Sequence, residues 1–454
     1  MTARGLGPWR WAAVVLFGYV LARPVSSNQV LVPVLALMGA LAAGAIVLAR
    51  RQLAGPLLPV LLTTFAFGLT GLAAGPTNPG VFSGVLVFVA APLLWWMVAT
   101  AVDERMLRAA FTVAALVTIW LGGTIAVFVA QSTGGLPDVL PSWVLDQYGA
   151  AIGGEYGAVR ADSSDYTQIR FYGLTTLVAT GPMWVASLVV PRDPLLPPQW
   201  LRVVAAVAAT AGTLAAGRRA LALVLIVSPL LAWAVKAVLS RSGEARLSRR
   251  QRRGLGVGAV TTVVLLYLTP GASGIVTAAV GGLAGYVTGD DDAATSSPDD
   301  VLRTYQADRL LDAWSSQPVF GHGFGAVLND FSRSVEEPWR WELQYHALLF
   351  WTGLVGVLLV VAGAALTLNA VVRGARARPD LVPSMVVACT AAAGMLIANA
   401  TNPYLQAPAR VWSIFLPVAI ANVMLISAAR RPDGPGGRSP TARDRVRLRA
   451  QARG

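Results

Sequence analysis

Twelve long apolar runs dominate this sequence and restrict the chain to a membrane fold. A bilayer core about 30 Å thick needs about 20 apolar residues per helix. Hydrophobic residues make up 55% of the 454 residues and charged residues only 13%, about half the charged share of a soluble domain. An ordinary soluble enzyme is therefore excluded, and so is a disordered chain, which needs low hydrophobicity and high charge. The runs are Trp9–Ala22, Val30–Ala49, Leu57–Ala74, Val81–Val102, Leu107–Gln131, Arg170–Val190, Trp200–Ala216, Ala220–Leu239, Leu255–Thr269, Tyr345–Val372, Leu381–Ala400 and Val411–Ala428.

The distribution of basic residues predicts the orientation of these runs. If the N-terminus is cytoplasmic and the runs alternate, the inner segments hold 26 of the 36 lysines and arginines but only 7 of the 23 acidic residues. The basic clusters at 236–253 and 430–453 then both lie inside. One helix more or fewer would place one of them outside, so the helix number is expected to be even. The net charge of +13 then reflects orientation and contact with anionic lipid, and no nucleic-acid partner is expected.

The predicted fold is all-α: a polytopic integral membrane protein with twelve transmembrane helices and both termini in the cytoplasm. The first run is short, and a cleaved signal peptide is its alternative. We expect a retained helix, because Arg23-Pro24 is a poor cleavage site. The transmembrane domain is predicted to cover residues 1–429, and residues 430–454 are predicted to form a basic, disordered cytoplasmic tail.

Two long outer loops, 132–169 and 271–344, interrupt this domain. Loops of such length are usually functional or disordered. In the second loop, apolar residues recur at helical spacing over 301–315 with charged residues between them. This pattern predicts an amphipathic helix on the outer membrane surface, before the tenth transmembrane helix. The glycines of Gly321–Gly325 follow no strand, so they predict a flexible turn rather than a dinucleotide-binding loop.

Arginines on the outer side oppose the charge bias and are candidate functional residues. Arg218 and Arg219 form a turn between two runs, Arg170 opens the sixth run, and Arg303 begins the surface helix, with Gln306 one turn further on. A guanidinium binds phosphate bidentately and stays charged at any relevant pH. The alternative is that these side chains reach lipid phosphates as interfacial anchors, or, for Arg303, that it lies on an ordinary solvated helix face.

A carboxylate and an imidazole stand four residues apart where the tenth run begins, as Glu342 and His346. On a helix they share one face, and either could serve as a general base. The alternative is a helix-start carboxylate favoured by the helix dipole, beside an interfacial histidine. With one cysteine, Cys389, and two histidines in the chain, we expect no disulfide framework, no metal site and no cofactor.

Together these motifs resemble the O-antigen ligase and O-antigen polymerase family of membrane glycosyltransferases. The resemblance spans about residues 165–360 and rests on the order and spacing of four stretches. They are similar to the family's arginine-glycine helix start, its Ser-Arg-Gly turn, its arginine-headed helix with a following Pro-x-x-Gly-x-Gly turn, and its helix closing with Gly-Leu-x-Gly. In this chain the stretches are Arg170–Gly173, Gly217–Leu221, Arg303–Gly325 and Glu342–Gly356.

The resemblance implies a polyprenyl-diphosphate-linked glycan donor and a saccharide acceptor that meet at the outer face of the plasma membrane. Transfer would invert the configuration at the anomeric carbon and would need no metal. The residues implied for binding the diphosphate are Arg219, Arg218, Arg303 and Arg170. The residues implied for binding sugars are Gln306, Tyr345 and Trp339.

Glu342 or His346 would be the catalytic base in this family context. Ligases of the family typically carry histidine at the position of Glu342, eleven residues before Gly353. We therefore favour Glu342 as the base and His346 as the second choice, and glutamate there is more similar to the polymerase-type members. A transporter or flippase of lipid-linked saccharide is the alternative function. Against it, the two halves show no repeat symmetry and the polar residues lie at the outer rim.

Overall fold

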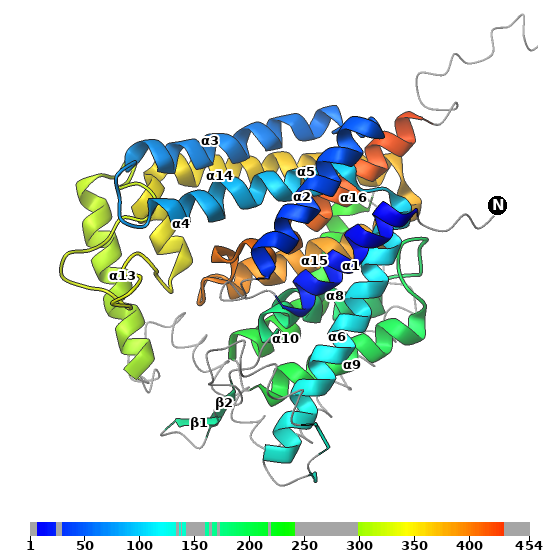
Figure 1. Cartoon of the computed structure of the whole chain (residues 1–454), viewed down its shortest axis with the longest axis horizontal. Coiled ribbons are helices and arrows are strands. Elements are labelled where there is room, and N and C mark those ends of the chain that lie inside the picture. Colours follow the sequence, from blue (N-terminus) through cyan, green and yellow to red (C-terminus); the bar gives the residue numbers. More distant parts are fainter. Residues whose placement is uncertain are drawn as a thin grey trace, which may run out of the picture.

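The computed structural model describes residues 7–23, 30–132, 136–137, 139–141, 159–162, 166–169, 173–216, 219–240 and 298–430. Helices make up nearly all of this part (Figure 1). In chain order the elements are α1 (Pro8–Ala22), α2 (Leu31–Leu48), η1 (Gly55–Leu57), α3 (Leu58–Ala74), α4 (Val81–Val85), η2 (Leu86–Ala90), α5 (Ala91–Ala101), α6 (Glu104–Ser132), β1 (Val159–Asp162), β2 (Tyr166–Ile169), α8 (Leu174–Val189), α9 (Gln199–Ala215), α10 (Arg219–Leu239), α13 (Pro298–Ser316), α14 (Gln344–Ala377), η3 (Pro379–Leu381), α15 (Val382–Ala398), η4 (Tyr404–Gln406), η5 (Pro408–Arg410) and α16 (Trp412–Ala429).

Eleven of the twelve apolar runs fold as helices, and the ninth, Leu255–Thr269, lies outside the described residues. Eight helical spans of the described chain are long and apolar enough to cross a membrane, and α1 and α8 are shorter apolar helices. The chain is a polytopic helical membrane protein. The total of twelve spans and the cytoplasmic position of the termini stay predictions. One feature departs from the all-α prediction: strands β1 and β2 pair antiparallel within the first long loop.

Several loops that the charge distribution predicts to lie on the outer side of the membrane contact one another at one end of the bundle. Helix α13 packs on the start of α14 at one end of the bundle (Figure 1). Asn78, between α3 and α4, donates a hydrogen bond to the carbonyl oxygen of His322 at 2.8 Å. Gln406, between α15 and α16, donates to the carbonyl oxygen of Trp341 at 3.3 Å. Segments predicted to lie outside are therefore neighbours in space.

Side chains on the rim of the bundle are apolar and exposed, as lipid contact requires. Leu48 on α2, Leu69 on α3 and Leu358 on α14 are 86%, 61% and 66% exposed. The main core lies inside, among α1, α5, α6, α8, α9, α10, α15 and α16. A second, smaller core lies beneath α13, around Leu310, Phe324 and Trp341. Trp341 in this second core directly precedes Glu342 in the chain.

The helix predicted over 301–315 is present as α13. Its contact side faces the small core through Gln306 and Leu310, both 0% exposed. Val301 and Leu302 on α13 are 55% and 42% exposed, and Tyr305 is 47% exposed although its ring packs on Phe331 with ring centroids 5.1 Å apart. An outward apolar face suits a helix at a membrane surface, and that placement stays a prediction.

Helix α14 is broken at Gly353, where φ is +59° and ψ is −162°. The break frees backbone groups that a bilayer cannot satisfy, and the loop after α13 fills the gap. The N–H groups of His322 and Gly323 donate to the carbonyl oxygens of Phe350 and Trp351 at 2.9 and 2.8 Å, and the N–H groups of Leu354 and Val355 donate to the carbonyl oxygens of Pro318 and Val319 at 2.9 and 3.1 Å. The nine residues before Gly353 therefore belong structurally with α13 and its loop.

The Gly321–Gly325 turn is present but closely packed rather than flexible as predicted. Gly321, Gly323 and Gly325 all have positive φ, between +69° and +85°, a region that only glycine enters readily. A Cβ on Gly323 would lie 2.2 Å from the backbone nitrogen of Gly75. The ring of Phe324, between these glycines, is fully buried and stacks on Phe88 with ring centroids 4.7 Å apart. The turn is anchored between α3, α4 and α14.

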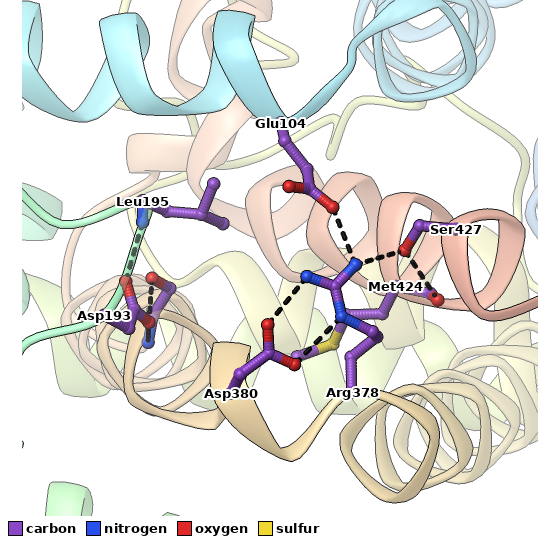
Figure 2. Close-up of polar contacts among 8 residues, drawn as sticks. Glu104, Asp193, Leu195, Arg378, Asp380, Met424 and Ser427 are labelled. Carbon is purple, nitrogen blue, oxygen red and sulfur yellow. Dashed lines mark hydrogen bonds and ion pairs between the residues drawn. The ribbon is translucent and has the colours of Figure 1, made fainter. Parts of the chain in front are cut away.

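An ion-pair network closes the opposite end of the bundle (Figure 2). Arg378, only 5% exposed, donates to both carboxylate oxygens of Asp380 at 2.9 and 2.7 Å and to Glu104 at 2.7 Å. It also donates to the Ser427 hydroxyl at 2.6 Å. The hydrogen bonds to Asp380 raise the pKa of Arg378 further above its ordinary value, against the effect of burial. One guanidinium thus joins the ends of α6, α14, α15 and α16.

Replacing Arg378 by alanine should lower the free energy of unfolding by about 1–3 kcal/mol, because several charge-assisted hydrogen bonds are lost at once. The loss stays within this range because Asp380 and Glu104 are 43% and 36% exposed at their side chains and water can solvate them. Thermal unfolding in matched detergent micelles measures the change. Arg378→Lys keeps the charge but not the forked contact with Asp380, so it should fall between the wild type and alanine. Equal melting temperatures for all three proteins would contradict this account.

Candidate functional site

Glu342 lies between two arginines just before α14. Its Oε2 is 3.1 Å from Nε of Arg303, which projects from the first turns of α13. Its Oε1 is 2.5 Å from Nη2 of Arg333, in the loop that follows α13. The carboxylate keeps 30% of its side-chain surface exposed. Arg303 and Glu342, which the sequence analysis singled out separately, are thus in direct contact.

The backbone at Glu342 is held from inside by Gln306. The side chain of Gln306 is fully buried one turn after Arg303. With its amide oxygen turned towards α14, it accepts hydrogen bonds from the N–H groups of Glu342 and Leu343, each at 3.1 Å. Gln306 was predicted to bind sugar; the structure shows it buried against the backbone at Glu342, and a sugar contact stays a prediction.

A cleft of about 300 Å³ opens beside Glu342. One wall comes from the loop after α13 and the other from the segment that joins α15 to α16. Gln406 on that segment bridges the two walls, donating to Trp341 and, at 2.7 Å, to Oε1 of Gln344. The residues that line the cleft are Arg333, Ser334, Arg340, Trp341, Glu342, Pro403, Gln406, Ala407 and Arg410.

The cleft is rich in cations. Three arginines line it against one carboxylate, Glu342, which Arg303 and Arg333 already share. Arg340 is paired with Glu337 at 2.5 Å, and both side chains remain exposed. The guanidinium carbon of Arg410 lies 5.9 Å from the ring centroid of Tyr404. No carboxylate within the described ranges lies within ion-pair distance of Arg410.

Two predicted residues lie around the site rather than in the cleft. His346 is half-buried in the first turn of α14, and its ring makes no hydrogen bond with any residue the structure describes. The hydroxyl of Tyr345 donates to the carbonyl oxygen of Leu396 at 2.6 Å, which ties α14 to α15.

Trp339 also lies outside the cleft, although the resemblance implied a sugar contact for it. It packs on Gly80, where a Cβ would lie 2.2 Å from the indole. It lines a smaller cavity of about 20 Å³ together with Arg340 and Gln406. Its place next to two cleft residues is compatible with a sugar contact, which stays a prediction.

The remaining predicted arginines cannot be placed at the site. Arg170 and Arg218 lie outside the described residues, and Arg219 is the first residue of α10 but its side chain is outside the described part. Their binding of a diphosphate therefore stays a prediction.

Sequence reasoning missed Arg333, Arg340, Arg410 and Gln406. A signal for the three arginines was available, because all three lie in segments predicted to be outside, against the charge bias that singled out Arg218 and Arg219. Gln406 carries no comparable signal, since an isolated glutamine in a loop follows no pattern.

The arrangement combines a carboxylate that can accept a proton with guanidinium groups that can hold an anion. Within the described residues, no group of three or more His, Cys, Asp or Glu side chains could hold a metal ion. Metal-independent chemistry stays a prediction.

The chain matches no protein-family model and no curated protein in the comparisons made with known proteins. Its class is therefore defined by fold and geometry: a polytopic helical membrane protein with a cationic cleft beside an arginine-clamped carboxylate.

Proposed function

We propose that this chain is a membrane glycosyltransferase of the kind that the O-antigen ligases and polymerases represent. It would transfer or polymerise a glycan from a polyprenyl-diphosphate carrier onto a saccharide acceptor, at the outer face of the plasma membrane. The observation that carries the proposal is the contact of Glu342 with Arg303 and Arg333 at the mouth of a cleft. A base and anion-binding groups then lie within one site.

In the proposed reaction Glu342 takes the proton from an acceptor hydroxyl. The hydroxyl oxygen forms a bond with the anomeric carbon of the donor sugar, and the bond from that carbon to the diphosphate oxygen breaks with inversion. The leaving diphosphate keeps the electron pair, and fixed guanidinium groups stabilise its growing charge. Arg303 is the described arginine on the α13 side of Glu342 and is assigned to this task, together with Arg219, Arg218 and Arg170.

The ion pairs of Glu342 suggest how the base becomes available. In the free protein both carboxylate oxygens accept hydrogen bonds from arginine. An entering diphosphate would compete with Glu342 for these guanidinium groups, since arginine binds phosphate bidentately. Release of Arg303 would leave Oε2 free to accept the acceptor proton. His346 is the second choice for the base, one turn deeper in α14.

Arg303→Ala should reduce glycan transfer by about 100-fold or more, the usual effect of removing a group that stabilises a leaving or developing charge. The measurement compares cell-surface glycan and lipid-linked intermediates in a deletion strain that carries the wild-type or the variant chain. Arg373→Ala, on the exposed surface near the far end of α14, removes one positive charge away from the site and should leave transfer unchanged. Full glycan transfer by both the Arg303→Ala and the Arg219→Ala variant would contradict the proposal.

The deletion strain also separates the related activities. Single repeat units left on the final acceptor would indicate a polymerase, and long chains stranded on the carrier would indicate a ligase. Intermediates trapped on the cytoplasmic side would indicate a flippase. The break in α14 at Gly353 is the one observation that favours a transporter, because transporters often use discontinuous helices. Here, however, the loop after α13 fills the break, and no substrate cavity is needed to explain it.

A further inference from the structure

We propose that the cleft beside Glu342 binds an oxyanion on the acceptor, so that the acceptor is an acidic saccharide carrying a carboxylate or a phosphate ester. This inference rests on the proposed function and adds the substrate class. Its binding residues are Arg340, Arg410 and Gln406, none of which the resemblance assigns.

The two oxygens of Glu342 face different sets of cations. Oε2 meets Arg303 on α13, which is not among the residues that line the cleft. Oε1 meets Arg333, which lines it. If Arg303 holds the diphosphate of the donor, the cleft lies on the other side of the base. The acceptor hydroxyl must reach Glu342, so the cleft is the place for the acceptor.

The charges in the cleft determine what the acceptor carries. Arg333 is paired with Glu342 and Arg340 with Glu337. Arg410 has no carboxylate partner among the residues the structure describes, and Nε of Arg410 is buried there without a hydrogen-bond acceptor. A buried donor without an acceptor costs free energy, and an oxyanion would supply that acceptor. A neutral sugar would leave the charge of Arg410 without a counter-charge within the described residues.

The size and composition of the cleft fit a sugar better than a lipid. Its volume of about 300 Å³ is at the small end of ligand pockets, enough for a short saccharide. Gln406 carries a side-chain amide of the type that fixes sugar hydroxyls in place, and Ser334 adds a hydroxyl group. An acyl chain would place its apolar surface against three guanidinium groups.

Binding can be measured without a donor, on the purified full chain in a polyoxyethylene detergent that carries neither sugar nor charge. Isothermal titration calorimetry would compare trigalacturonate with neutral galactotriose, mannose 6-phosphate with mannose, and inorganic pyrophosphate alone. We expect at least one acidic saccharide to bind about tenfold or more tightly than its neutral counterpart, and to weaken as salt rises.

Variants locate the binding. Arg410→Gln and Arg340→Gln should each weaken binding of the acidic saccharide by about tenfold, the usual contribution of a charge-assisted hydrogen bond. Arg340 is 46% exposed at its side chain, so its replacement should not disturb folding even if that of Arg410 does. The matched control, Arg373→Gln, should bind like the wild type. Arg303→Ala should lose transfer but keep this binding.

Equal binding of acidic and neutral saccharides would overturn the proposal, and so would weakening by Arg373→Gln equal to that by Arg340→Gln. The proposal would also be overturned if pyrophosphate bound, neither acidic saccharide bound, and Arg410→Gln abolished the binding of pyrophosphate. The cleft would then hold the diphosphate of the carrier. Retained binding by a protein that never transfers glycan would instead contradict the proposed function and leave this inference standing.

Discussion

Replacement of Glu342 by glutamine is expected to reduce glycan transfer by about 100-fold or more while the protein still inserts and folds. Glutamine has nearly the same shape but cannot take up the acceptor proton, and a positioned general base typically contributes a factor of about 10²–10⁴. Folding should persist because the ion pairs of Glu342 are partly exposed, and such pairs contribute about 0–1 kcal/mol each. Accumulation of the lipid-linked donor in cells measures the defect.

Two further variants sharpen this test. Glu342→Asp keeps the carboxylate but shortens its reach by one methylene, so it should retain a measurable part of the activity. His346→Gln removes the second candidate base. Full activity of Glu342→Gln together with loss in His346→Gln would exchange the two roles and would place the base one turn deeper in α14.

Gly323→Ala is expected to destabilise the protein by about 3 kcal/mol or more. Its φ of +85° costs an alanine about 1–3 kcal/mol, and the added Cβ would lie 2.2 Å from a backbone atom of Gly75, which cannot move as the end of a side chain could. The turn should therefore separate from α3, and the loop that fills the break in α14 would be displaced with it. Thermal unfolding followed by tryptophan fluorescence in detergent measures the loss.

The matched control for this change is Gly123→Ala. Gly123 lies inside α6, where an added Cβ has nothing within 4 Å. Alanine in a helix interior is more stable than glycine by about 0.5–1 kcal/mol, so this variant should melt slightly higher than the wild type. A similar loss in both glycine variants would show that packing at the turn is not the cause.

Much of the fold could be predicted from the sequence because apolar length is a strong signal in a membrane protein. Eleven runs became helices, and helical spacing over 301–315 predicted α13. The break at Gly353 could not be predicted in the same way. It lies inside a continuous apolar run with no proline, and the broken hydrogen bonds are replaced by a loop about 30 residues earlier in the chain.

The site was predictable in part. Arg303 and Glu342 were both singled out, but only tertiary structure brings Nε of one within 3.1 Å of the other. Arg410 contributes from a segment 68 residues after Glu342, and no local pattern links the two. For Gln306, the sequence predicted a position on the helix. Its contact with the backbone at Glu342 depends on tertiary packing, which the residue type alone does not indicate.

The loop that fills the break in α14 determines when the site can form during synthesis of the chain. It is held by a segment made before it, since Asn78 donates to His322 over a separation of 244 residues, and the facing wall with Gln406 and Arg410 is made after α15. Helices inserted one after another from the N-terminus would therefore leave the site incomplete until α15 and α16 have joined the bundle. Under the proposed function, a nascent or truncated chain would therefore lie in the membrane before it could transfer glycan.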